Sequence, residues 1–254
     1  MANIKLTIQY DGTNYSGWQV QPNARTIEKT LTEAIEKLLQ EKINLIGAAR
    51  TDAGVHALGQ VANFHSTKLF PATSNIFSWD KNKDFLRSLN CILPKDISVK
   101  NIEPVSDDFH SRFKSKTKLY KYQIWKSIAH SPFYYSYSWH IPYHLDEESI
   151  RKAAQYLVGE KDFASFQGAG CDSKSTVRRI DLVEIKNNGN LMEILIEGSG
   201  FLKHMVRNIA GTLVRIGTGN IEPEMIKDIL NAKNRSAAGP TAPSKGLFLV
   251  EVKY

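Results

Sequence analysis

The sequence predicts an α+β fold made of two α/β halves with largely antiparallel sheets. Strand-like segments in both halves alternate apolar and polar residues, and segments with helical spacing of apolar residues lie between them. Asn187-Asn188-Gly189 joins two alternating segments and is a strong hairpin signal. We expect the division near 106–110, which gives domains 1–107 and 108–254, with sheets that join and leave a cleft between the halves.

The first half begins with a period-two strand at 4–10. Thr26 is a plausible N-cap for a helix over 27–39, whose apolar residues recur at helical spacing. The remaining predicted elements are strands at 43–49 and 60–66, a helix over 83–93 ended by Pro94, and a strand at 97–105. The stretch 67–79 has no clear pattern. This order is close to a ferredoxin-type split unit.

The second half repeats the theme. Its predicted strands are 117–126, 178–186, 191–197 and 246–253. Its predicted helices are 146–158 with Gly159 as the C-cap, a long apolar helix over 201–216, and a shorter one that has Pro223 at its first position.

The basic balance of the chain is compatible with a polyanionic partner. The chain has 33 basic and 26 acidic residues, a net charge of +7, although a solvated lysine surface would give the same balance. Cys91 and Cys171 belong to no disulfide or metal motif. The N-terminus lacks a signal-peptide pattern, and no apolar run reaches the roughly 18 residues of a membrane span. We expect a soluble, cytoplasmic protein.

The stretch GAARTDAGVHALGQ, residues 47–60, is the strongest candidate for a site. Arg50, Thr51, Asp52, Gly54 and His56 crowd polar and ionisable groups between two strand-like runs. Loops held by strands are where functional residues tend to lie. On spacing alone, an Asx-turn in which Asp52 bonds the backbone ahead of Gly54 explains the stretch equally well.

Residues 112–126 contain six basic and four aromatic residues and no acidic one. Basic side chains contact phosphates and flat rings stack on bases, so this pattern favours binding of exposed nucleotides over an edge strand guarded by lysines. Tyr120, Tyr122 and Ile124 share one face by strand period. At least one of these tyrosines could therefore belong to the core.

The apolar helix predicted over 201–216 carries Lys203, His204 and Arg207, which helical spacing places on one side. A solvated face is one reading. A helix this apolar should be largely buried, however, and a buried arginine needs a carboxylate partner. Elsewhere, HIPYH (140–144) has Pro142 between its two histidines and no CxxC is present, so we expect no catalytic metal.

Two motifs make the chain resemble a known family. These are ARTDAGVHA (49–57) and, before it, YDGT (10–13) with GWQ (17–19). They resemble the TruA family of tRNA pseudouridine synthases, which modify the anticodon arm. The resemblance runs nearly end to end, through FHSRF (109–113), KLYKY (118–122), DFASF (162–166), GFLKHMVRNIAGTLVRIG (200–217) and GLFLVEV (246–252). It implies the pseudouridine synthase fold, with a central basic active-site cleft.

The resemblance also implies a reaction. Uridines 38 to 40 of tRNA would be isomerised to pseudouridine without a cofactor, in a homodimer. Asp52 would be the nucleophile and Arg207 its partner, while Tyr120 and Arg50 would support the flipped nucleotide. We further expect RNA contacts from basic residues near these positions, namely Lys114, Lys116, Lys118, Lys203 and His204.

Two alternatives remain at this point. One is a non-catalytic tRNA-binding or chaperone protein, against which the Arg50-Thr51-Asp52 triplet argues, and the other is the same chemistry at another tRNA site. Attack of Asp52 on C1′, attack on C6 and a glycal route all stay open.

Overall fold

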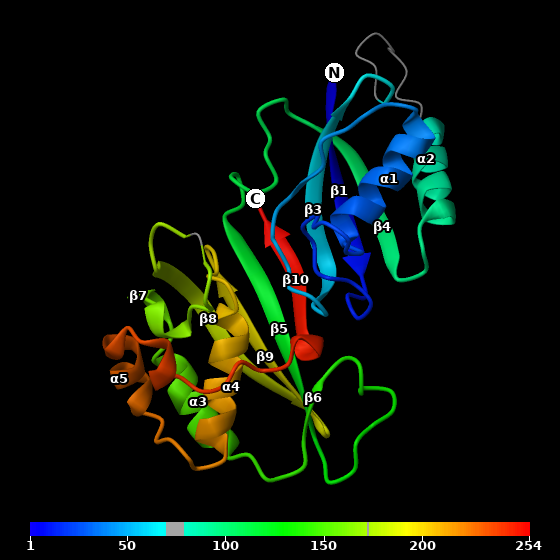
Figure 1. Cartoon of the computed structure of the whole chain (residues 1–254). Helices are drawn as coiled ribbons and strands as arrows, with labels where there is room; N and C mark the ends of the chain where they lie inside the picture. The colour runs from blue at the N-terminus through cyan, green and yellow to red at the C-terminus, as the bar shows by residue number, and fades with distance from the viewer. Residues whose placement is uncertain (70–78, 172) are drawn as a thin grey trace. The chain divides into compact units, whose positions relative to one another are not determined.

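The computed structural model (Figure 1) describes residues 1–69, 79–171 and 173–254. For residues 79–82 it describes the backbone and not the side chains. Most of the stretch without a predicted pattern, 70–78, lies outside this description. The chain forms two compact units, the first from 1–116 together with 249–254 and the second from 117–248. In the described residues no helix is long and apolar enough to cross a membrane.

The units divide after Lys116, whereas the sequence placed the boundary at 107/108. Segment 109–116 is tied to the first unit by long-range hydrogen bonds. Ser111 donates its backbone N–H to Asn63 Oδ1 (2.9 Å) and its hydroxyl to the Ile46 carbonyl (2.6 Å). The Lys116 N–H donates to the Lys253 carbonyl (2.8 Å), so the end of the chain returns to this unit.

In its described residues, the first unit is an antiparallel sheet with two helices. Its elements in chain order are β1 (Ala2–Tyr10), α1 (Ile27–Leu39), β2 (Ile46–Gly47), β3 (His56–Ser66), α2 (Trp79–Ile92) and β4 (Ile97–Val105). β1 lies between β4 and β3, and β2 pairs with β3. On the far side of β3 lies β10 (Leu247–Lys253), of which residues from Leu249 onward belong to this unit.

Every second residue of β1 points to the same face of the sheet. Ile4, Leu6 and Ile8 lie on that face and are fully buried, so they form part of the core of this unit. The strand β4 and the helix α1 have the predicted bounds. Three details differ from the prediction. β2 is only two residues long, and α2 runs over Trp79–Ile92 where a helix over 83–93 was expected. β3 begins at His56, so His56 lies on a strand and not in the loop.

The second unit is also an antiparallel sheet covered by helices. Its elements are β5 (Thr117–Lys126), β6 (Trp139–Ile141), α3 (Glu147–Gln155), β7 (Gly159–Asp162), β8 (Val177–Asn188), β9 (Leu191–Gly198), α4 (Met205–Gly217) and α5 (Met225–Ala232). Strand order is β5-β9-β8-β7, with β6 parallel to β5. α3 and α4 lie side by side (Figure 1) and pack on β8 and β5 respectively.

Strand predictions for this unit are confirmed at β5 and at the β8–β9 hairpin, where Gly189 has a φ of 59°. The predicted C-cap is wrong, because α3 ends before Tyr156 and Gly159 starts β7. β6 and β7 were not predicted. The helix α4 begins at Met205 and not at Phe201, which changes the setting of two predicted site residues.

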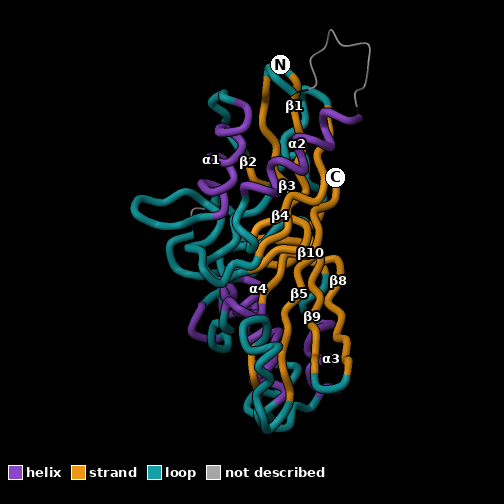
Figure 2. Tube along the Cα trace, turned by 90° about the vertical axis from the view of Figure 1, so that its right-hand side faces the viewer, coloured by secondary structure: helices purple, strands orange, loops and turns teal. Residues whose placement is uncertain are grey.

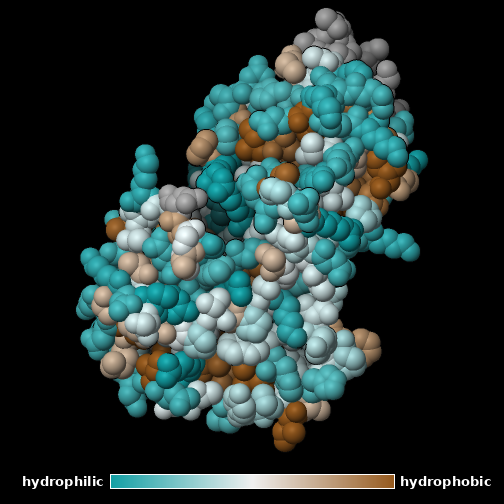
Figure 3. Space-filling view, in the orientation of Figure 1, coloured by the Kyte–Doolittle hydropathy of each residue, from teal (hydrophilic) through white to brown (hydrophobic). Residues whose placement is uncertain are grey.

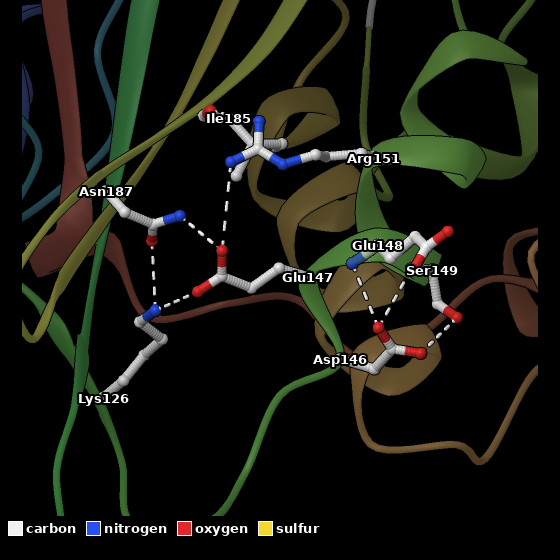
Figure 4. Close-up of polar contacts among 8 residues, drawn as sticks. All are labelled: Lys126, Asp146, Glu147, Glu148, Ser149, Arg151, Ile185 and Asn187. Atoms are coloured by element: carbon white, nitrogen blue, oxygen red, sulfur yellow. Dashed lines mark hydrogen bonds and ion pairs between the residues drawn. The ribbon is translucent and has the colours of Figure 1, made fainter.

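Two consecutive acidic residues fix the start of α3 and attach the helix to the sheet (Figure 4). Asp146 caps the helix, since its Oδ1 accepts the N–H of Glu148 (3.0 Å) and of Ser149 (3.2 Å). The next residue, Glu147, bonds Lys126 of β5 and Asn187 of β8. One carboxylate thus ties the helix to two strands, and the Lys126 bond lowers the pKa of Glu147.

In each unit the strands lie side by side as a sheet, which Figure 2 shows in orange. On the face drawn in Figure 3, hydrophilic side chains predominate and apolar ones show as separate small patches. That face is therefore typical of a surface in contact with water.

Candidate active site

The loop of residues 48–55 joins β2 to β3 and holds Asp52 at its centre. Thr51 before it is buried, with its hydroxyl 2.7 Å from Tyr10 Oη and its carbonyl accepting the Trp18 N–H (3.0 Å). The Val55 N–H donates to the Asp52 carbonyl (3.2 Å) and closes a turn, with Gly54 at a φ of 73°. This backbone keeps the Asp52 side chain half-buried at the surface of the loop.

Gln60 fixes the first residues of this loop. Its side chain is fully buried, and its amide bonds both backbone groups of Ala49, donating from Nε2 to the carbonyl (2.7 Å) and accepting the N–H at Oε1 (3.2 Å). The side chain acts here as a neighbouring strand would. Gln60 lies in the stretch that the sequence singled out, yet its role follows only from this three-dimensional arrangement.

The earlier motif, residues 10–19, packs directly against the loop. A Cβ added at Gly12 would lie 2.0 Å from the Val55 carbonyl oxygen. One at Gly17 would lie 2.6 Å from the Thr51 carbonyl oxygen, on a backbone with a φ of 93°. Such separations leave room for hydrogen alone. The two motifs that carry the family resemblance are therefore one structural feature.

His56, at the start of β3, contacts residues 11 and 12 of the earlier motif. Its ring is buried, and Nδ1 lies 3.1 Å from the Gly12 N and 3.1 Å from Asp11 Oδ1. A backbone N–H can only donate, so the Gly12 bond requires an unprotonated Nδ1, whereas an Asp11 ion pair would require a protonated ring. One nitrogen cannot satisfy both at once, and in either state Nδ1 of His56 contacts segment 11–12.

Arg50, two residues before Asp52, is exposed. Its charge acts on Glu28 at the start of α1, whose pKa is raised by burial and lowered in part by the N–H of Val20 and by Arg50. Glu28 also accepts Gln19 Nε2 (2.8 Å), which belongs to the earlier motif. Arg50 and Asp52 are two residues apart in the loop, and the side chains of both reach the surface.

In the second unit, the two candidate tyrosines differ in role. Tyr122 is fully buried, and its hydroxyl donates to the Pro243 carbonyl (2.8 Å), so it is the core tyrosine. The Tyr120 ring is 8% exposed and lies edge-on to Phe201, with centroids 5.0 Å apart. Both stand on β5, two residues apart, and so share a face of the sheet.

Arg207 lies in the first turn of α4 and is half-buried. Its Nε donates to the Ala242 carbonyl (2.7 Å), and the Ala242 N–H donates back to the Arg207 carbonyl (3.2 Å). Its charge also reaches Tyr122, whose pKa is raised by burial and lowered in part by Arg207. The predicted carboxylate partner, Asp52, belongs to the other unit, and that pairing stays a prediction.

The predicted common helix face of Lys203, His204 and Arg207 is wrong. Lys203 and His204 precede α4, and His204 takes a left-handed backbone with a φ of 59°. The Lys203 carbonyl accepts the Gly168 N–H (2.7 Å), and a Cβ at Gly168 would lie 2.7 Å from the His204 ring. The chain therefore turns sharply just before the helix, and side-chain spacing counted along a helix does not apply there.

The three lysines near Tyr120 have different settings. Lys114 is exposed and pairs with Asp108 Oδ2 (2.7 Å), and Lys116 is exposed in the same unit. Lys118 is half-buried on β5, opposite Gly198. The first unit thus contains Arg50, Asp52, Lys114 and Lys116. The second contains the other candidates, Lys118, Tyr120, Lys203, His204 and Arg207.

Comparison with known proteins identifies the family. A family model described as tRNA pseudouridine synthase matches residues 6–114 and 153–254. Proteins called tRNA pseudouridine synthase A match over 254 residues and 100% of both chains, with 44% identity in Thermoanaerobacter sp. strain X514 and in Acetivibrio thermocellus and 41% in Geobacter sulfurreducens.

A crystal structure of the archaeal box H/ACA sRNP Nop10-Cbf5 complex covers 92% of this chain and 60% of that one, at 10% identity and a TM-score of 0.36. That likeness is weak. The family model and the full-length relatives agree with each other and with the motifs packed around Asp52. This chain belongs to the tRNA pseudouridine synthase family.

Proposed function

We propose that this protein isomerises uridine to pseudouridine at positions 38, 39 and 40 in the anticodon stem-loop of tRNA. The observation that carries the proposal is the braced loop 48–55, which holds Asp52 half-buried on a backbone fixed by Gln60 and by the segment containing Gly12 and Gly17. A binding protein has no need for a carboxylate held so rigidly, because a negative charge repels RNA phosphates.

The reaction is an isomerisation in which all atoms are retained. The C1′–N1 bond of uridine breaks, the uracil turns, and a C1′–C5 bond forms while C5 loses a proton and N1 gains one. No electrons are exchanged with a partner, so no redox cofactor is required. Asp52 acts as the nucleophile in this proposal, and an ionised carboxylate has the reactivity needed.

The other residues have supporting roles. The target lies in a stacked stem, so the nucleotide must be flipped out and held by a flat ring and a cation. Tyr120 and Arg50 supply these, and Arg207 keeps Asp52 ionised through its positive charge. Tyr120 suits stacking because its ring is already fixed edge-on by Phe201. Basic side chains outside this group contact phosphates, namely Lys114, Lys116, Lys118, Lys203 and His204.

The test uses tRNA transcripts with tritium at C5 of uridine, which is released when C5 is joined to C1′. We expect release from transcripts with uridine at 38, 39 or 40, and none from a transcript that lacks uridine there. Asp52→Asn should abolish release while tRNA binding persists. Asp228→Asn, which removes an exposed carboxylate on α5, controls for the loss of charge. Measurable turnover by purified Asp52→Asn protein would refute the role of Asp52.

The same assay separates the alternatives. A protein that binds tRNA and releases no tritium is a tRNA-binding or chaperone protein. Release from the transcript without uridines at 38 to 40 assigns the chemistry to another tRNA site. Dialysis against a chelator should leave the rate unchanged, since no step of the proposed reaction uses a metal.

We further propose a homodimer that works in the cytoplasm, where tRNA is found. Large apolar side chains stand exposed close together in one stretch of the second unit, residues 128–137, including Ile128 (89%) and Phe133 (85%), and a group of this kind favours a protein partner. Sedimentation equilibrium should give about twice the 28.6 kDa mass of one chain. A single-chain mass at micromolar concentration would overturn this.

A further inference from the structure

The segment 239–242, which follows α5, is docked along the first half of α4. Its Ala242 exchanges hydrogen bonds with Arg207 in both directions, and its Gly239 N–H donates to Thr212 Oγ1 (2.9 Å). At Gly211 the backbones touch, because a Cβ there would lie 1.8 Å from the Pro240 carbonyl oxygen. The segment therefore meets the helix in one fixed register.

The side chain of Arg235 holds this segment in place. Its Nη1 donates to the Gly239 carbonyl (2.8 Å), and its Nη2 donates to Asn208 Oδ1 (3.0 Å) and to Thr241 Oγ1 (3.0 Å). The Thr241 hydroxyl donates in turn to Asn208 Oδ1 (2.6 Å). Every donor of this guanidinium that the structure describes as bonded serves the segment or the helix beneath it.

Asn208 completes the cluster from the helix side. It is buried, immediately follows Arg207, and donates from Nδ2 to the Phe166 carbonyl (2.7 Å). In the described part of the chain, the partners of Arg235 are neutral oxygens, and burial lowers the Arg235 pKa. Removing a charged group from water costs free energy, and neutral acceptors offset less of that cost than a carboxylate would. We therefore look for the role of Arg235 in the backbone geometry that its hydrogen bonds fix.

We propose that Arg235 and Asn208 are positioning residues for Arg207, which they orient by holding the Ala242 carbonyl against its Nε. Arginine has a long, flexible stem and a planar head, so one fixed acceptor at Nε sets the plane and direction of the guanidinium. The inference rests on the proposed function, because Arg207 matters to the reaction only if it acts in the active site.

The same segment also reaches the strand that carries Tyr120. The carbonyl of Pro243, the residue that follows the segment, accepts a hydrogen bond from the hydroxyl of Tyr122. Tyr122 lies two positions after Tyr120 on β5. Loss of the Arg235 cluster should therefore affect the second unit's active-site groups together, through one short piece of backbone. It should leave the phosphate-binding lysines untouched.

A double-mutant cycle separates positioning from plain stabilisation. We expect Arg235→Gln to lower the single-turnover rate at saturating tRNA by about tenfold, a size typical of residues in one hydrogen-bonded network, and to change the tRNA Kd by less than about twofold. Arg207→Lys also slows the reaction, because lysine has no Nε–H fork. If Arg235 acts through Arg207, the double variant is no slower than Arg207→Lys.

Two controls match these variants. Arg215→Gln removes an exposed arginine from the same helix, and Ile226→Val removes a buried methyl group from α5 and so weakens the unit without touching the cluster. Both should keep the wild-type rate. Fold reductions in rate that multiply in the double variant, or an Arg235→Gln enzyme with a normal rate, would overturn the proposal.

A measurement on the side chain itself keeps the inference separate from the proposed function. The Nε–H of Arg207 gives an NMR signal that is assigned by its disappearance in Arg207→Lys. Its exchange with solvent should be slow in the wild type and in Arg215→Gln, and markedly faster in Arg235→Gln. Equal exchange in all three refutes the positioning role. A wild-type protein that forms no pseudouridine refutes the proposed function, while the exchange data still decide whether Arg235 orients Arg207.

Discussion

Replacing Gln60 by leucine is the sharpest test of how the loop around Asp52 is held. The change keeps a side chain of similar volume, now apolar, in a fully buried position. It removes the donor to the Ala49 carbonyl (2.7 Å) and the acceptor of the Ala49 N–H (3.2 Å), and with them the bond from the Val61 N–H (3.2 Å). Leucine offers no replacement for any of these bonds.

The magnitude follows from the groups left without a partner. A buried polar group that loses its hydrogen bond costs about 1–3 kcal/mol, so the two backbone groups of Ala49 together cost about 2–6 kcal/mol. A domain is stable by only about 5–15 kcal/mol, so the effect should be large. We also expect the single-turnover rate to fall more than tRNA binding, because the loop that carries Asp52 loses its anchor.

Urea unfolding followed by circular dichroism measures the first effect, and tritium release at saturating tRNA measures the second. Gln9→Leu, at an exposed position of β1, is the matched control and should change stability by less than about 0.5 kcal/mol. A Gln60→Leu protein with the wild-type unfolding midpoint and an unchanged slope would show that the loop does not depend on this amide.

Three further predictions concern other groups. Tyr120→Phe should retain more of the single-turnover rate than Tyr120→Leu, since stacking is worth about 1–3 kcal/mol per base, and equal losses would assign the role to the hydroxyl. Alanine at Lys114, Lys116 or Lys118 should weaken tRNA binding and reduce the log–log salt slope by about 0.7–0.9 for each phosphate that the variant no longer binds, and an unchanged slope would return that lysine to the solvated surface. The lysine bond lowers the pKa of Glu147 below its ordinary 4.5, so its stabilising effect is present above that pH and lost as the pH falls through the folded-state pKa. Glu147→Gln should therefore lose less stability than the wild type when both are acidified below about pH 4.5 in thermal unfolding, and parallel losses would contradict this linkage.

Local patterns made much of the sheets predictable. Apolar residues recur at every second position of β1, the strands β4 and β5 have the predicted bounds, and the β8–β9 hairpin turns at Gly189, within the predicted Asn-Asn-Gly signal. The helix α4 was harder, because Phe201 and Leu202 continue its apolar pattern. The reversal at His204 depends on contacts with Gly168, which are distant in sequence and leave no local signal.

The candidate site was predictable only where its residues form a local pattern in the sequence. Asp52 stood out because a guanidinium, a carboxylate and an imidazole crowd one short stretch between strand-like runs, and a resemblance gave it a role. Gln60 and Arg235 did not stand out, since an amide inside a strand and an arginine after a helix are common in any sequence. Their roles come from bonds to backbone groups at Ala49 and Gly239, and side-chain type alone does not reveal such partners.

The contact of Gly12 and Gly17 with the loop that carries Asp52 has a consequence for protein engineering. The two segments are in direct backbone contact, and neither glycine has space for a methyl group. A chimera that takes only one segment from a relative with a different loop path would set side chains against backbone oxygens and fail, although each segment is native to a working enzyme. Exchanging both segments together should restore the fit, so the pair is the smallest unit of this site that can be transplanted.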